Sequence, residues 1–159
     1  MKKCVKIVLR LQEAAGTLLL AVFFVAILAQ IAARYMKIPL LWTEELANYS
    51  FIWAVFMGAS AMVYHKAHFC FTFFRERFKG RMTAVYNIFV YAVLLSFTVP
   101  LFLYGIEVTW TFWNYNWITL PWVKMGYTWL CLPIMGFTMS FYIVALMLED
   151  LRVALGRNA

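Results

Sequence analysis

Residues 14–33 read AAGTLLLAVFFVAILAQIAA, an apolar run without a single charged side chain. An α-helix rises about 1.5 Å per residue, so about 20 residues cross the roughly 30 Å hydrocarbon core of a bilayer. The run is too long for the apolar part of a cleaved signal peptide, which has about 7–15 residues. It is therefore predicted to be a membrane span.

Three further apolar blocks of similar length follow along the chain. The composition is 65% hydrophobic and 13% charged, whereas soluble proteins have about 45–50% apolar and about 25% charged residues. We therefore expect an all-α integral membrane protein, with one domain over residues 1–159. Its four transmembrane helices are predicted at 14–33, 46–64, 84–104 and 126–148.

The distribution of charge predicts the orientation. The chain has 14 Lys and Arg against 7 Asp and Glu, and the basic residues gather in the N-terminal segment and in the connection 65–81. Because basic loops stay on the cytoplasmic side, both termini are expected in the cytoplasm. Tryptophans prefer the headgroup level, and most of them cluster at the two predicted outer connections: Trp42, Trp110, Trp113, Trp117, Trp122 and Trp129.

The connection from His68 to Arg81 alternates phenylalanines with basic residues. Its cations are Arg75, Arg77, Lys79 and Arg81. We expect a cytoplasmic interfacial segment between the second and third helices, with rings in the acyl boundary and cations at lipid phosphates. A nucleic-acid patch is disfavoured, because the phenylalanines need lipid or protein cover.

The second span opens with carboxylates. Thr43 is a candidate N-cap, and Glu44 and Glu45 follow it, where acidic groups suit the helix dipole. Two interpretations stay open. The carboxylates serve helix initiation, or they pair with cations of a partner protein or with Arg34 at the outer interface. Trp42 belongs to the same predicted interface.

Small residues form a stripe along the second span. Ala54, Gly58 and Ala61 are spaced by four and three residues, and such stripes let helix backbones approach closely in lipid. The stripe predicts a packing surface for another helix, either of this chain or of a partner.

No centre for chemistry is evident in the predicted spans. Ionisable residues within spans mark ion paths, and none lies near a span centre. The central hydroxyls are expected to bond back to their own helices: Ser96, Thr98, Thr138 and Ser140. His65 and His68 lie at one end of one helix, which does not suit haem or a metal site. Pro100 and Pro133 predict kinks. No catalytic, cofactor or metal site is predicted.

The stretch from Trp42 to Ala61, WTEELANYSFIWAVFMGASA, followed by His68, resembles the small membrane subunit of TRAP transporters, the tripartite ATP-independent periplasmic transporters. The later stretches Leu120-Pro121-Trp122 and Leu132–Gly136 are similar to the family's entry into its last helix. One departure concerns an Asp that members often carry after the His, where this chain has Thr72 and no nearby carboxylate.

The resemblance implies a non-catalytic subunit in the bacterial inner membrane. Its partners would be a large sodium-coupled elevator subunit and a periplasmic binding protein that delivers an organic acid, either a sugar acid or a dicarboxylate. Sodium would bind in the large subunit and no cofactor in this chain. Two alternatives remain: a self-sufficient small homo-oligomeric transporter or exporter, and a membrane anchor of a redox complex.

Overall fold

The computed structural model describes residues 2–65 and 81–154. Its helices are α1 (Lys2–Tyr35), α2 (Trp42–Tyr64), α4 (Arg81–Thr111), the short α5 (Met125–Trp129) and α6 (Cys131–Ala154). Four helical stretches in these residues are long and apolar enough to cross a membrane: Val5–Tyr35, Trp42–Tyr64, Met82–Thr111 and Met125–Arg152. The predicted all-α fold with four spans is therefore confirmed.

The first helix begins earlier than the sequence suggested. The first span was predicted at 14–33, whereas α1 already begins at Lys2. Lys, Arg, Leu, Gln and Glu are good helix formers, and no glycine or proline precedes Gly16. The helix therefore continues through its charged end, and it carries Gln12 and Glu13 into the bundle.

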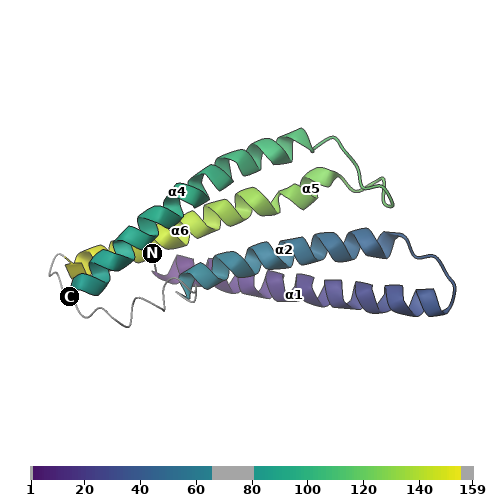
Figure 1. Cartoon of the computed structure of the whole chain (residues 1–159), viewed down its shortest axis with the longest axis horizontal. Coiled ribbons are helices and arrows are strands. Elements are labelled where there is room, and N and C mark those ends of the chain that lie inside the picture. The colour runs from purple at the N-terminus through teal and green to yellow at the C-terminus, as the bar shows by residue number, and fades with distance from the viewer. Residues whose placement is uncertain (1, 66–80, 155–159) are drawn as a thin grey trace.

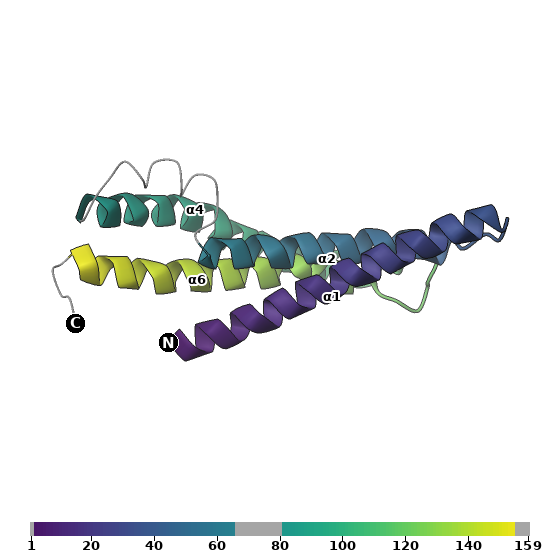
Figure 2. The ribbon, with the colours of Figure 1, turned by 90° about the horizontal axis from the view of Figure 1, so that it is seen from below.

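The helices form two hairpins. In Figure 1, α1 lies beside α2, and α4 lies beside α5 and α6, while the connections 36–41 and 112–124 share one end of the molecule. The view in Figure 2 shows α1 running obliquely along α2, so that its N-terminal part diverges from the end of α6. Contacts between α2 and α6 join the two hairpins.

Helix α6 is the central element of the described bundle. One core cluster joins α6 to α2 and α4 through Val63, Tyr91, Met135, Met139, Ile143 and Leu146. A second cluster joins it to α1 and α2 through Val5, Leu9, Ala61 and Tyr142. In the most apolar window of each span, 56% of residues are buried in the last span but only 6% in the first. Most of α1 therefore faces lipid or another protein.

Glycines set the separation of α4 and α6. A Cβ built on Gly136 would lie 2.7 Å from the backbone nitrogen of Phe102, and one on Gly105 would lie 2.9 Å from that of Pro133. Real Cβ atoms do not approach backbone so closely, so both positions require glycine at this helix spacing. The close approach increases dispersion contacts, which drive helix association in lipid.

The sequence predicted kinks at Pro133 and Pro100, and the helices differ at these two positions. Helix α5 ends at Trp129 and α6 begins at Cys131, so the regular helix is interrupted at Leu130, close to Pro133. Proline lacks an N–H and its ring clashes with the carbonyl four residues earlier, and the kink expected there stays a prediction. Pro100 stays within the continuous helix α4, which bends along its length in Figure 1. The aromatic stretch from Trp110 to Trp117 extends α4 only to Thr111 and then turns into a loop.

Candidate functional site

A network of buried polar side chains joins three helices. The side-chain nitrogen of Gln12 on α1 donates to the hydroxyl of Ser60 on α2 and, at 3.1 Å, to that of Thr138 on α6. The hydroxyl of Tyr142 on α6 donates to the Gln12 side-chain oxygen at 2.7 Å. All four residues are buried. We call this set the Gln12 network.

Each side-chain donor in the Gln12 network has a hydrogen-bond acceptor within the described chain. Ser60 donates to the carbonyl of Met57 at 3.1 Å, and Thr138 donates to the carbonyl of Ile134 at 2.8 Å. Both hydroxyl oxygens then accept from the Gln12 amide. Since an unpaired polar group in hydrocarbon is costly, this balance favours a role in holding helices together over a role in binding a solute.

Further polar bonds join α4 to α6. Ser140 donates to Thr98 at 2.9 Å, so the expectation that Ser140 bonds to its own helix was wrong. The expectation is confirmed for Ser96, which donates to the carbonyl of Val93 at 2.7 Å, and for Thr138. The central hydroxyls are thus divided between their own helices and a neighbouring helix.

Sequence reasoning missed Gln12, because it lay inside the basic run that was placed outside the span. The sequence nevertheless contained a pattern that places Gln12 on a buried helix face. Val5, Leu9, Gln12 and Gly16 are spaced by four, three and four residues, and all four are buried in the structure. This spacing defines one face of a helix and extends the buried face of α1 to its first turns.

A groove of about 400 Å³ follows the surface of the α1–α2 hairpin. Small residues of both helices line it, and its end near the close of α2 carries Glu13 and His65. The His65 Nε2 atom lies 2.6 Å from a carboxylate oxygen of Glu13, and the two side chains are 49% and 42% exposed. The pair ties the end of α2 to α1 at the rim of the groove.

The predicted small-residue stripe divides between the core and the groove. Ala54 and Ala61 are buried against neighbours within the chain, and Gly16 packs on this surface, its Cβ position lying 3.2 Å from the Cβ of Met57. Gly58 is exposed, and apart from its chain neighbours and the backbone of its own helix no heavy atom of the described chain lies within 4 Å of its Cβ position. Its predicted role in close packing with a partner helix stays a prediction.

Glu45 binds a loop of its own chain. Its carboxylate accepts hydrogen bonds from the backbone N–H groups of Ile118 and Thr119, both at 2.9 Å, and from the Thr119 hydroxyl. Charge-assisted bonds to a carboxylate are about twice as strong as neutral ones. The start of α2 is thereby fastened to the loop between α4 and α5. We call this contact the Glu45 clamp.

An aromatic pair, Tyr49 and Trp117, lies next to the Glu45 clamp in the chain. The rings of Tyr49 and Trp117 lie 4.6 Å apart between centroids, and the Trp117 indole donates to the Thr128 hydroxyl at 3.0 Å. The loop itself is closed by backbone bonds from Trp117 to Val123 at 2.9 Å and from Met125 to Tyr115 at 2.8 Å. The connection 112–124 is therefore an ordered part of the bundle end.

The other residues of the predicted outer interface are exposed. Trp42, Glu44 and Arg34 all lie on the surface at the end that holds the two connections, and no ion pair joins them within the described ranges. Thr43 is not the N-cap of α2: it is the second residue of the helix, and its hydroxyl donates to the carbonyl of Leu40 at 2.7 Å. Glu44 and Glu45 do lie in the first turn.

Most of the predicted interfacial cations lie outside the residues that the structure describes. Arg75, Arg77 and Lys79, which were predicted to contact lipid, are not among the described residues, nor is His68, and Arg81 is the first residue of α4. In the parts of the chain that are described, no three His, Cys, Asp or Glu side chains gather as a metal site would require.

Four apolar helices, joined by buried polar bonds that satisfy one another, define a multi-pass membrane protein. The family model described as tripartite ATP-independent periplasmic transporters, DctQ component, matches residues 23–153. The chain therefore belongs to the DctQ family, the small membrane component of TRAP transporters, as the sequence resemblance predicted. A search of curated proteins found no match.

Proposed function

We propose that this chain is the non-catalytic, stationary subunit of a TRAP-type secondary transporter in a bacterial inner membrane. In this proposal it scaffolds a large sodium-coupled elevator subunit. A periplasmic binding protein delivers an organic acid, a sugar acid or a dicarboxylate, to that large subunit. Sodium and substrate bind in the partner, and both termini of this chain lie in the cytoplasm.

One observation carries the proposal: the interior polar groups of the Gln12 network bond to one another across α1, α2 and α6. An ion or solute site needs polar atoms that are free to exchange water for ligand. Side chains that are already fully bonded suit a rigid frame. An elevator subunit requires such a frame, because its moving part has to slide against helices that do not move.

The groove on the α1–α2 hairpin is the face proposed for the large subunit. Most of α1 is uncovered within the chain, and Gly58 leaves open space in the groove. A helix of the large subunit would fit there by backbone approach. The Glu13–His65 pair at the rim adds a polar contact at one end of the groove.

The decisive experiment is reconstitution of uptake in proteoliposomes. The large subunit, the binding protein and this chain together should take up the organic acid with a sodium gradient. This chain alone should not, and the large subunit without it should lose most of its uptake. Transport by the purified chain alone would instead support the homo-oligomeric transporter, and bound haem or a redox partner would support the anchor.

Replacement of Gly58 tests the docking face. Gly58→Leu should fill the groove and reduce co-purification with the large subunit. Ala92→Leu is the matched control, because Ala92 lies on the exposed surface of α4, away from the groove. Unchanged co-purification of the Gly58 variant would move the interface elsewhere.

A further inference from the structure

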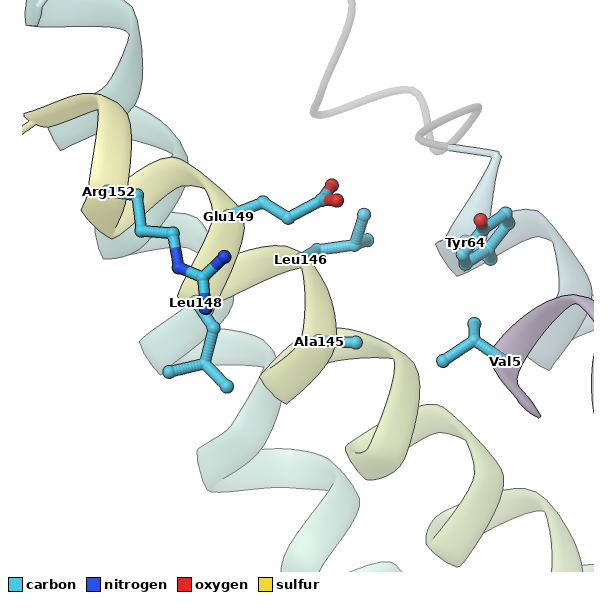
Figure 3. A pocket seen from close by; sticks show the side chains of 7 residues that line it. All are labelled: Val5, Tyr64, Ala145, Leu146, Leu148, Glu149 and Arg152. Atoms are coloured by element: carbon cyan, nitrogen blue, oxygen red, sulfur yellow. The ribbon is translucent and has the colours of Figure 1, made fainter. Parts of the chain in front are cut away.

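A second cavity, of about 330 Å³, lies where α1, α2 and α6 meet near the chain termini. Figure 3 shows Val5 of α1 and Tyr64 of α2 facing Ala145 and Leu146 of α6 across it. Leu148, Glu149 and Arg152 of α6 complete the lining. The cavity belongs to neither the groove near Gly58 nor the Glu45 clamp.

The cavity lies at the ends of three spans. Val5 is the first residue of one candidate span, Tyr64 is the last of the next, and Arg152 is the last of the fourth. Residues at span ends lie at the depth where hydrocarbon meets headgroups. An occupant at this depth has one apolar end and one polar end, as a membrane lipid has.

The side chains that line the cavity suit a position at the boundary between hydrocarbon and headgroups. Val5, Ala145, Leu146 and Leu148 provide an apolar surface, while Glu149 and Arg152 stand at the rim. The cavity volume of about 330 Å³ leaves room there for part of an acyl chain. Packed side chains of the described residues do not fill that space.

The rim carries opposite charges one helical turn apart. Arg152 has no ion-pair partner in the described part of the chain, and a guanidinium matches the oxygens of a phosphate. Glu149, three residues earlier on the same helix, presents a carboxylate with several acceptor sites, so it can accept from an ammonium in addition to other contacts.

We propose that this cavity binds a phospholipid whose headgroup combines a phosphate with a primary ammonium, such as a phosphatidylethanolamine. The phosphate lies at Arg152, the ammonium at Glu149, and an acyl chain lies over Val5 and Leu148. The lipid fills the cavity that the described residues of α1, α2 and α6 leave open. This inference does not depend on the transport role proposed above.

The test uses the full-length chain in detergent and native mass spectrometry. Ethanolamine, glycerol and choline phospholipids with identical acyl chains are added separately. The ethanolamine lipid should bind best. Arg152→Gln should weaken its binding by about threefold to tenfold, as loss of a charge-assisted bond predicts, and Glu149→Gln should abolish the preference over the glycerol lipid. Arg34→Gln, at the other end of α1, should leave the binding of all three lipids unchanged.

A cavity-filling variant keeps the test independent of charge. Ala145→Leu should exclude the lipid while leaving both rim charges in place, and thermal unfolding in detergent would show that each variant is folded. Equal binding of the three lipids, or full binding by Arg152→Gln, would overturn the proposal. Competition by soluble phosphoethanolamine would also overturn it, since the site would then bind a phosphate compound without the membrane.

Discussion

A glutamine within a membrane helix is stabilising only when neighbouring helices supply partners for its amide. Gln12 has partners on both α2 and α6, so a single side chain fixes the position of α1 against both. Bonds of this type in membrane proteins contribute about 0.6 kcal/mol on average and up to about 1.7 kcal/mol. The network therefore has a measurable effect on stability without dominating it.

Gln12→Leu should lower the stability of the folded chain by about 1–2 kcal/mol, because three bonds between helices are lost and the buried Tyr142 hydroxyl is left without its acceptor. Reversible unfolding in mixed micelles measures this change. Gln30→Leu is the matched control, as it makes the same substitution in the same helix at a side chain with no partner among the described residues. Equal effects of the two variants would refute the importance of the network.

Glu45→Gln should loosen the loop that the Glu45 clamp holds. The variant keeps the shape of the side chain but removes the charge that strengthens three hydrogen bonds. Hydrogen exchange at the amides of Ile118 and Thr119 should become about tenfold faster or more. Glu44→Gln removes a neighbouring exposed carboxylate and should leave both rates unchanged. Slow exchange in the Glu45 variant would mean that the loop is held by its own backbone bonds.

The two residues show how far sequence reasoning reaches at this scale. The carboxylates at the start of α2 stood out by position, but the partners of Glu45 could not be derived. Ile118 and Thr119 are 73 and 74 residues away in the chain, and two of the three donors are backbone N–H groups. Backbone donors have no residue type that a pattern can reveal. Gln12 was missed for a different reason: charge near it was interpreted as the end of the helix.

At the scale of elements, the two hairpins use glycine differently. Gly105 and Gly136 lie in direct backbone contact between α4 and α6, whereas Gly58 borders open space. Glycine therefore lies in a helix–helix contact within the chain at Gly105 and Gly136, and on an uncovered helix surface at Gly58. The sequence showed the glycines, but only the structure shows which helix each one faces.

Gly136→Ala should destabilise the α4–α6 pair by about 1–3 kcal/mol, because the added methyl would meet the backbone of Phe102 and force the helices apart. Gly58→Ala should be neutral or slightly stabilising, since alanine is the better helix former and its methyl meets nothing. Thermal unfolding of the two variants side by side makes the comparison. Equal melting temperatures would show that α4 can move away from α6 without cost.

The number of membrane-spanning helices could be predicted from the lengths of the apolar blocks. The residues at which these helices begin and end could not. The spans are set by the thickness of a bilayer, so their number can be counted in the sequence. The ends depend on local bonds instead. α1 continues to Lys2 because nothing breaks it, and the regular helix of the last span is interrupted at Leu130, close to Pro133.

At the scale of the whole molecule, the structure places the connections 36–41 and 112–124 at one end. The side of the membrane that this end faces rests on the distribution of basic residues. Cysteines introduced at Lys37 and Asn116 should both react with an impermeant maleimide added outside intact cells, in a background without native cysteines. A cysteine at Lys3 should react only after permeabilisation. The reverse pattern would invert the proposed orientation.

The central position of α6 has a consequence for biosynthesis. Thr138 and Tyr142 lie 126 and 130 residues after Gln12 in the chain, so the ribosome makes them long after α1 has entered the bilayer. Until α6 is made, the Gln12 amide can bond to Ser60 but not to Thr138 or Tyr142. During the same interval no helix lies between α2 and α4. The bundle is completed only when its last span is inserted, so a chain that stalls before α6 lacks the Thr138 and Tyr142 partners of Gln12.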